Sequence, residues 1–368
     1  MTRQLGVEEE LLLVDPATGR PKALAGAVLD RAAQRLGRDD GPGGAVEAEL
    51  QQEQVESATR PRRRLEDVAA EVRRYCRAAA DAAHEAGVEL AALAVTPLPA
   101  EPTLTPSRRY RRMAREFGLT AAEQLSCGCH VHVEVADDEE GVAVLDRIRP
   151  WLSVLIAISA NSPFYQGADS GYESFRTQVW GRWPSAGPYE PFGSADGYHG
   201  AIESLIASGT LLDRGMTYFD ARLSADYPTV EVRVGDVCLH PDDTVLLAAL
   251  SRGLVETAAR QASAGEPVPA VRTEILRAAN WRAARSGLRD ALVDPRSLRS
   301  APAAHVLTAL VDHVSDALDD DGDLGTVRSL LQDLWERGNG AARQRETYER
   351  TGRLQDVVRM AVRNTVVG

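Results

Sequence analysis

Acidic residues stand on segments whose other residues are typical of a buried core. Residues 5–14 alternate and then run apolar, which predicts a strand with Glu8 and Glu10 on one face. Two carboxylates on one strand face repel each other unless water or a cation lies between them. The segment therefore fits either a cation site or the solvated face of an edge strand, and its own pattern leaves both open.

A second acidic segment, ELQQEQVESAT at 49–59, carries Glu49, Glu53 and Glu56. Spacings of four and seven residues would put all three on one face of a helix. On a regular strand Glu49 and Glu56 would face opposite ways, so both could reach one metal only across a bulge or bend. Taken alone, the segment predicts an exposed helix.

Two histidines alternate with valine in the segment 127–135, CGCHVHVEV. A period of two places His130, His132 and Glu134 on one face of a strand. A strand with two alternating histidines can bind zinc, although either histidine can equally be a hydrogen-bonded residue of the core. The motif by itself leaves both readings open.

A carboxylate and a guanidinium share a face of the segment 228–238, where Glu231 and Arg233 alternate with valines. Such a pair can be a simple ion pair, or it can hold Mg²⁺ and a phosphoryl oxygen side by side. Four such segments, three of them strand-like, could converge on one concave face of a sheet. Oxygen ligands in that number favour Mg²⁺ or Mn²⁺ over zinc.

The elements that must position these segments indicate an α+β fold. Strands are expected at 5–14, 88–95, 127–135 and 228–238, and helices at 24–37, from 65 to near Gly87, and at 140–160 with a kink at Pro150. The glycine-rich residues 37–44 are expected to form a loop. From Pro241 onward the chain is expected to be mostly helical, with breaks at 264–269 and 319–325.

A long segment at 163–200 is rich in glycine, proline and aromatic residues. It shows no obvious regular pattern and is expected to be an irregular loop. Loops of such length are uncommon in compact proteins and are usually functional, although a structural surface loop is the alternative.

The composition narrows the class of function. A formal net charge of -12 and a pI of about 5.2 argue against nucleic acid or an anionic membrane as the main partner. The first residues do not form a signal peptide, and no run reaches the roughly 18 apolar residues of a membrane span, so a cytoplasmic location is expected. Lys22 is the only lysine and lies outside any glycine-rich phosphate loop, which excludes a Walker-type site. The four cysteines are expected to be reduced thiols.

Six segments, in order and over most of the chain, resemble the glutamate–cysteine ligase type 2 family of carboxylate–amine ligases. They are GVEEELLLVDPATG at 6–19, ELQQEQVESAT at 49–59, CGCHVHVEV at 127–135, SANSPFYQGADSGYESFRTQVW at 159–180, DARLSADYPTVEVRVGDVCLHPDDT at 220–244 and NWRAARSGL at 280–288.

The resemblance implies a single catalytic domain over 1–368, strand-rich to about residue 240 and helical over 241–368. Its fold would be of the glutamine synthetase type, in which a curved, mainly antiparallel sheet forms a funnel covered by helices. The funnel's inner face would carry two Mg²⁺ sets. The first is Glu8, His130 and Glu231, and the second is Glu10, Glu49 and Glu56. For the segment 49–59 the resemblance implies a strand with an irregularity, against the helix that its spacing predicts.

The implied activity is an ATP-dependent ligation with Mg²⁺, or Mn²⁺, as cofactor. The γ-carboxylate of glutamate would become an acyl phosphate and then an amide with an amine such as cysteine. Arg233 and Arg176, and then Arg222, are the candidates that would contact the γ-phosphoryl group. No nucleophilic side chain is needed for this chemistry.

The mechanism leads to a further hypothesis about the substrate, because water must be kept from the acyl phosphate. The segment 163–200 would be a lid that excludes water, with Tyr172 and Ser174 facing inward beside Arg176. His132 would be either structural or substrate-facing. The expected partners are small molecules, and the oligomeric state is open, with a homodimer as one alternative.

Two rival functions stay open at this point. A zinc hydrolase could use His130 and His132, with a third ligand from His199 or His240. A non-catalytic relative could keep only the fold. Against the second rival, a protein without catalysis has no reason to keep a repulsive cluster of carboxylates.

Overall fold

The structure is a computed structural model that describes residues 2–37 and 43–367. A seven-stranded sheet runs through its centre in the order β2-β3-β1-β5-β9-β8, with β4 also paired to β1. All of these pairs are antiparallel. The strands are β1 (Leu5–Val14), β2 (Ala45–Ala48), β3 (Gln54–Ala58), β4 (Glu89–Ala91), β5 (Gly128–Glu134), β8 (Ala221–Leu223) and β9 (Thr229–Asp236).

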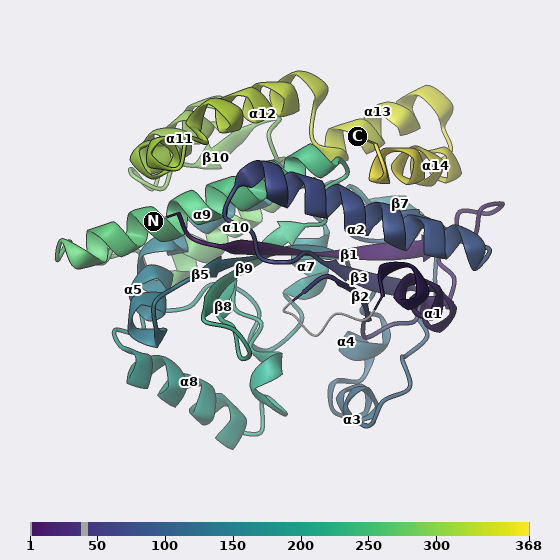
Figure 1. The fold of residues 1–368 in the computed structure, drawn as a ribbon, viewed down its shortest axis with the longest axis horizontal. Coiled ribbons are helices and arrows are strands. Elements are labelled where there is room, and N and C mark those ends of the chain that lie inside the picture. The colour runs from purple at the N-terminus through teal and green to yellow at the C-terminus, as the bar shows by residue number, and fades with distance from the viewer. Residues whose placement is uncertain (1, 38–42, 368) are drawn as a thin grey trace.

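Helices lie on both sides of this sheet, and the two sides differ (Figure 1). One side carries most of the helices: α2 (Leu65–Glu85), α9 (Pro241–Ser263), α11 (Ala303–Asp320), α12 (Leu324–Arg337), α13 (Gly340–Thr351) and α14 (Leu354–Thr365). The other side carries fewer: α3 (Arg108–Phe117), α4 (Leu119–Ala122) and α8 (Ala195–Ala207). The remaining helices are α1 (Ala25–Leu36), α5 (Asp138–Ile148), α6 (Leu152–Ser159), α7 (Arg176–Trp180) and α10 (Thr273–Ser286). Two short ribbons pair β6 (Phe164–Tyr165) with β7 (Ala168–Asp169) and β10 (Ala291–Val293) with β11 (Ser300–Pro302).

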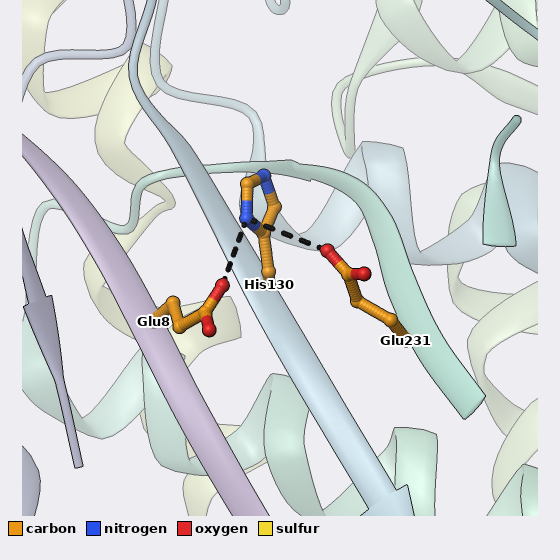
Figure 2. A group of neighbouring side chains, drawn as sticks. All are labelled: Glu8, His130 and Glu231. Carbon is orange, nitrogen blue, oxygen red and sulfur yellow. Dashed lines mark ion pairs between the residues drawn. The ribbon is translucent and has the colours of Figure 1, made fainter. Parts of the chain in front are cut away.

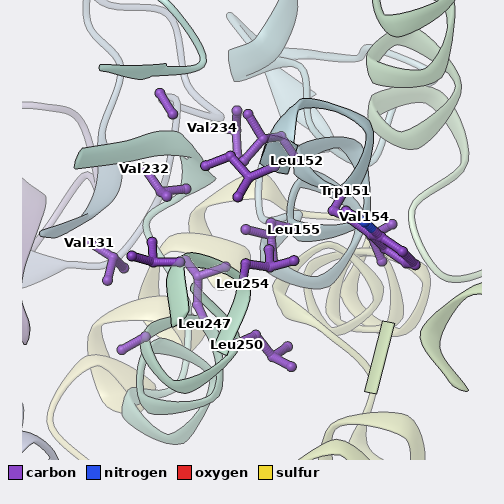
Figure 3. Packing of buried hydrophobic residues seen from close by; sticks show 14 of the residues in the cluster. Val131, Trp151, Leu152, Val154, Leu155, Val232, Val234, Leu247, Leu250 and Leu254 are labelled. Carbon is purple, nitrogen blue, oxygen red and sulfur yellow. The ribbon is translucent and has the colours of Figure 1, made fainter. Parts of the chain in front are cut away.

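Alternation along the strands separates a core face from a polar face. Valines of β5 and β9 pack against leucines of α6 and α9 in the main core (Figure 3). The residues labelled there are Val131, Val232, Val234, Trp151, Leu152, Val154, Leu155, Leu247, Leu250 and Leu254. Burial of each such side chain contributes about 1.5–3 kcal/mol, which holds every strand in one orientation. The acidic residues between the valines must then face the other side.

Strand-rich and helical parts share this core. One hydrophobic cluster contains Leu5, Val131 and Val230 together with Val306 and Leu334. The boundary near residue 240 between the strand-rich and helical parts is therefore a change in secondary structure, and the hydrophobic core continues across it. That the whole chain is a single catalytic domain stays a prediction. Among the described residues, no helix has both the length and the apolar character needed to cross a bilayer.

The segment 49–59 is a hairpin and not the exposed helix that its spacing predicts. Strands β2 and β3 pair with each other, with a turn between them, and β3 pairs in turn with β1. Glu53 lies buried in the turn, where its carboxylate accepts hydrogen bonds from the backbone N–H of Thr103 at 2.9 and 3.1 Å. The strand that the resemblance implies is present over Gln54–Ala58, while residues 49–53 form the turn that precedes it. Spacings of four and seven fit both structures, and long-range pairing decided between them.

Some of the other predicted elements are confirmed and some are wrong. The strands at 5–14, 127–135 and 228–238 are confirmed, as are the kinked helix near Pro150 and the mostly helical C-terminal part. The strand expected at 88–95 is shorter, because β4 ends at Ala91. The segment 163–200 is not an irregular loop, since it contains β6, β7, α7 and the start of α8 and buries Trp183 and Tyr189. The loop expected at 37–44 lies largely outside the described residues.

One buried histidine gives a stability prediction. The ring of His313 stacks on Trp151 with centroids 4.3 Å apart. Burial, with a smaller contribution from the charge of Arg296, lowers the pKa of His313 from 6.5 to about 4. Between these values the unfolded chain binds a proton that the folded protein does not, so the stability is complete above pH 6.5 and is lost as the pH falls toward 4.

Compared with His313→Gln, the wild type should lose about 2 kcal/mol more unfolding free energy between pH 7 and pH 4.5, after allowance for the partial exposure of the ring. Urea unfolding at several pH values measures this difference. Parallel pH profiles for the two proteins would contradict the prediction.

Candidate active site

Strand register brings the acidic residues of distant segments together on the polar face. In the antiparallel pairing, Glu8 of β1 lies opposite His130 of β5, and Glu10 lies opposite Glu56 of β3. Between Cys129 and Val131 the register of β5 with β9 shifts by an irregularity. Glu231 of β9 is thereby brought near both histidines of β5.

The first group consists of Glu8, His130 and Glu231 (Figure 2). Nδ1 of His130 lies 3.5 Å from Glu8 Oε2 and 3.9 Å from Glu231 Oε1. One potential ligand atom from each residue lies within 4.8 Å of the others. This spacing is close to what three ligands around one divalent cation would have, at about 2.1 Å each from the ion.

The second group consists of Glu10, Glu56 and His130, again with ligand atoms within 4.8 Å of one another. Glu49 joins it through a hydrogen bond with Glu56 and by proximity to Glu10. Burial, together with the charge of Glu10, raises the pKa of Glu49 to about 8. Burial and the neighbouring charges, that of Glu8 first, raise the pKa of Glu56 well above its usual range.

These groups fit a hard divalent cation. Among the described residues, Glu8, Glu10, Glu49 and Glu56 form no ion pair with an arginine. A bound cation would supply the positive charge that stabilises their ionised forms so close together. Burial, followed by the charge of Arg233, lowers the pKa of His130, so its imidazole is neutral and able to act as a ligand. Mostly oxygen donors with one histidine suit Mg²⁺ or Mn²⁺. Two residues of the predicted second set, Glu10 and Glu56, belong to the second group, whereas Glu49 lies beside it and His130 joins both groups. Their role in binding a metal stays a prediction.

Two arginines converge on Glu231. Nε of Arg222 donates to Glu231 Oε2 at 2.6 Å, and Nη1 of Arg233 forms an ion pair with Glu231 Oε1. Burial, and then the charge of Arg222, lowers the pKa of Arg233 to about 9. Nε of Arg233 is buried without a hydrogen-bond partner among the described residues. One donor of this guanidinium is thus free for a bound molecule.

Arg176 opens α7 and is 1 % exposed. Its backbone N–H donates to Ser162 Oγ at 3.0 Å, while its side-chain Nε and Nη2 are buried and donate to no partner among the described residues. Gly128 makes this placement possible. A Cβ on Gly128 would lie 2.3 Å from Nη2 of Arg176 and 2.9 Å from Nε2 of His130. The backbone N–H of Gly128 also donates to Glu10 Oε2 at 2.5 Å.

A cavity of about 250 Å³ lies over the two groups, and we refer to it as the acidic cavity. Its outer wall is aromatic and comes from α3, α7 and the segment before β8. Arg109 of α3 pairs with Asp213 at 2.8 Å and ties two parts of this wall together. The lining residues are Glu8, Glu10, Glu49, Leu50, Gln54, Glu56, Arg109, Tyr110, Met113, Gln124, Ser126, His130, Trp180, Trp183, Gly215, Tyr218, Arg222 and Arg233.

Not every predicted site residue lies in this cavity. Ser174 is fully buried, and its hydroxyl donates to Asp236 Oδ1 at 2.8 Å. The hydroxyl of Tyr172 accepts a hydrogen bond from Trp281 Nε1 at 3.2 Å. Neither residue lines the acidic cavity, so their contact with substrate stays a prediction. Nε2 of His132 lies 3.3 Å from Glu8 Oε1, beside the first group.

The histidines proposed to complete a zinc site lie elsewhere. His199 pairs with Asp138 at 2.8 Å, and His240 accepts the N–H of Asp242 at the start of α9. Neither belongs to a group of potential ligands among the described residues. The third ligand that the zinc reading requires is therefore not supplied by them.

Sequence reasoning missed the residues that shape the wall. Helix α3 stands in a stretch that also contains prolines, where its only local signal is the N-cap Ser107, whose side chain accepts from Tyr110 N at 3.0 Å. The role of Gly128 has no local signal at all, because Arg176 approaches it from a distant part of the chain.

Comparison with known proteins agrees with this geometry. The model of the family described as Glutamate-cysteine ligase family 2(GCS2) matches residues 4–360. The chain belongs to this family. A Streptomyces avermitilis member named "Putative glutamate--cysteine ligase 2-1" is 54% identical over 363 residues, which are 99% of this chain and 99% of that protein. A Frankia alni member named "Putative glutamate--cysteine ligase 2-2" is 52% identical over 372 residues, 99% of this chain and 97% of that protein.

Solved structures share the fold of this family member. A glutamate–cysteine ligase from Francisella tularensis in complex with AMP aligns with a TM-score of 0.70 at 13% identity, over 99% of this chain and 88% of that one. A bifunctional glutathione synthetase from Pasteurella multocida aligns with a TM-score of 0.67 at 16% identity, over 99% of this chain and 52% of that one. The expected α+β class, with a mainly antiparallel sheet covered by helices, is confirmed. At these identities the likeness concerns the fold alone.

Proposed function

We propose that this protein is an ATP-dependent carboxylate–amine ligase whose donor is the γ-carboxylate of glutamate. One observation carries the proposal. Carboxylates of both groups line one small cavity together with Arg233, which has a free N–H donor, and the buried Arg176 lies beside that cavity against Gly128. Membership of the family and the fold shared with a ligase crystallised with AMP support it.

The first residues to assign are those that would hold the cation. One Mg²⁺ would be bound by Glu8, Glu231 and His130. A second would be bound by Glu10 and Glu56, with Glu49 beside them. Bound Mg²⁺ would supply positive charge that offsets the repulsion between the phosphate groups and an incoming carboxylate. Mn²⁺ has the same ligand preference.

The arginines would act on the transferred phosphoryl group. Arg176 and Arg233 offer unpartnered N–H donors, whereas Arg222 is occupied by Glu231 and would hold that carboxylate in place. An oxygen of the donor carboxylate attacks the γ-phosphorus, and the bond to the oxygen shared with the β-phosphorus breaks. The products are an acyl phosphate and ADP. Fixed donors that face the γ-oxygens stabilise the charge of that transition state.

Amide formation completes the reaction. A neutral amine attacks the acyl carbon, the C–N bond forms, phosphate leaves with the electrons of the C–O bond, and the nitrogen loses a proton to solvent or phosphate. Water would compete as a nucleophile, so the site must be dry at this moment. The aromatic wall of Trp180, Trp183 and Tyr218, braced by the Arg109–Asp213 ion pair, limits access of water.

ADP release from ATP tests the proposal. With Mg²⁺, glutamate and a panel of amines that includes cysteine, ADP is expected to form only when both glutamate and a suitable amine are present. Omission of each substrate in turn is the control. ATP binding without turnover for every pair would contradict ligation of glutamate. Stoichiometric bound zinc with no ATP binding would instead support a hydrolase.

A further inference from the structure

A second cavity lies beside the acidic cavity, and its chemistry differs. Its volume is about 320 Å³, and Trp180 and Arg233 line both cavities, so these two side chains separate them. The guanidinium of Arg233 lies over the Trp180 ring at 5.8 Å, and that of Arg176 at 5.4 Å. The inner end of the second cavity is therefore the arginine pair that would contact the phosphoryl group.

The second cavity contains a carboxylate without a cationic partner. Nδ2 of Asn280 donates to Asp220 Oδ2 at 2.6 Å. No described residue donates to the other carboxylate oxygen of Asp220, and no described arginine or histidine shifts the pKa of this carboxyl group. Burial raises the pKa of Asp220 to about 6, against the effect of the Asn280 hydrogen bond, so the group is charged at pH 7.5. A half-buried anion without a counter-ion favours a cationic ligand.

The same cavity contains an arginine without a partner. Arg277 stands three residues before Asn280 on α10, so both project from one face of that helix. Within residues 2–37 and 43–367, Arg277 makes no side-chain hydrogen bond or ion pair. A free guanidinium binds carboxylates well because its N–H groups match both carboxylate oxygens. An anion site and a cation site thus lie in one cavity.

Apolar surface completes the lining. Ile156, Phe219 and Trp281 border the cavity together with its charged residues. A ligand with opposite charges at one end and a short methylene chain would match these three features. The head group of an α-amino acid has the required ammonium and carboxylate.

We propose that this cavity binds the α-amino-acid head group of the carboxylate donor, with its ammonium on Asp220 and its α-carboxylate on Arg277. The donor's second carboxylate then points past Trp180 to Arg176 and the acidic cavity. This inference rests on the proposed function and specifies its substrate class as an amino acid with a side-chain carboxylate.

The chemistry identifies the occupant as the donor and not the acceptor. The acceptor nitrogen must be neutral and must reach the acyl carbon, whereas an ammonium held by a carboxylate keeps its proton and its lone pair is unavailable. Only a substrate that reacts at its other end can leave its ammonium on Asp220. Glutamate activated at its γ-carboxylate meets this condition.

Asp220→Asn tests the proposal with little change of shape, because an asparagine oxygen can still accept from Asn280. We expect the KM for glutamate to rise about 10- to 100-fold, with kcat and the KM values for ATP and the amine nearly unchanged. Glutarate, which lacks the ammonium, serves as a second donor. The preference of the wild type for glutamate over glutarate in kcat/KM should fall by a similar factor in the variant. Asp226→Asn, in the exposed turn between β8 and β9, is the matched control.

The outcomes separate this inference from the proposed function. A raised KM for the amine, or unchanged constants for glutamate and glutarate, would overturn the inference while leaving the ligase intact. If the wild type makes no ADP from glutamate, calorimetric titration with glutamate decides. Binding to the wild type that weakens in Asp220→Asn would retain the assignment of the cavity, and equal binding or no binding would overturn it.

Discussion

Replacement of Glu8 by glutamine is expected to lower amine-dependent ADP release by about a thousandfold, at the upper end of the effect of removing one group that stabilises transition-state charge. Within residues 2–37 and 43–367, Glu8 forms no ion pair with an arginine, and its carboxylate lies 3.5 Å from His130 and 3.3 Å from His132. The amide preserves the shape of the side chain but offers a cation no charge. Initial rates over a titration of Mg²⁺ measure the loss, and thermal melts show whether the fold is retained.

Glu8 is the better position for this test, because its replacement should lower activity with little loss of stability. Glu231→Gln should also abolish activity, but it leaves the buried Arg222 and Arg233 without their counter-ion, a change that costs about 3–5 kcal/mol of stability. Glu134→Gln is the matched control, since Glu134 ends the neighbouring strand β5 but pairs with Arg63 outside both groups. Addition of Mg²⁺ should raise the Tm of the wild type and of Glu134→Gln more than that of Glu8→Gln. Wild-type turnover in Glu8→Gln would remove this residue from the cation site.

Gly128→Ala is the second change with a large expected effect. The added methyl group would lie 2.3 Å from Nη2 of Arg176 and 2.9 Å from Nε2 of His130, so one or both must move. A displacement of about 1 Å in a reacting group can cost about a hundredfold in rate, and insertion of a methyl group into a packed site costs about 1–3 kcal/mol. We therefore expect kcat/KM for ATP to fall by about a hundredfold and the Tm to fall by several degrees.

Gly6→Ala provides the matched control for that substitution. Gly6 lies on the neighbouring strand opposite His132, and a Cβ there would find its nearest atom, the carbonyl oxygen of Thr59, at 3.8 Å. This is an ordinary contact, so activity should be near that of the wild type. Equal activity in Gly128→Ala and Gly6→Ala would show that close approach of Arg176 to β5 is not needed for the reaction.

The polar face of the sheet could be predicted from the sequence because strand alternation and burial of the apolar residues give the same orientation. Apolar and charged residues alternate with period two in β5 and β9, and burial of the valines under α6 and α9 fixes which side is which. Local pattern thus placed His130 and Glu231 each on the polar face of its own strand, while their grouping with Glu8 was implied by the family resemblance. Their number and type favoured a hard cation over zinc, and the six matching segments indicated the family that the full-length comparison shows.

Local pattern was insufficient where two structures share one spacing. The spacing in segment 49–59 predicts a helix, although a strand with a bend is compatible with it, and only the pairing of β3 with β1 and β2 decides for the strand. In 163–200 the aromatic residues that suggested an irregular loop are packed side chains, since Trp183 and Tyr189 are buried against residues far along the chain. Such contacts leave no periodic signal in the segment itself.

The sequence by itself determined which residues could bind a cation, because side-chain chemistry and strand alternation are local properties. Only the tertiary structure decided that His130 belongs to both groups, that Arg176 lies against Gly128, and that Asp220 shares a cavity with Arg277. These relations join distant segments of the chain. Gly128 and Arg176 are 48 residues apart, and Asp220 and Arg277 are 57 residues apart. The physical reason is that strand register, the irregularity in β5 and the docking of α7 and α10 are set by burial of the whole core, and not by any one segment.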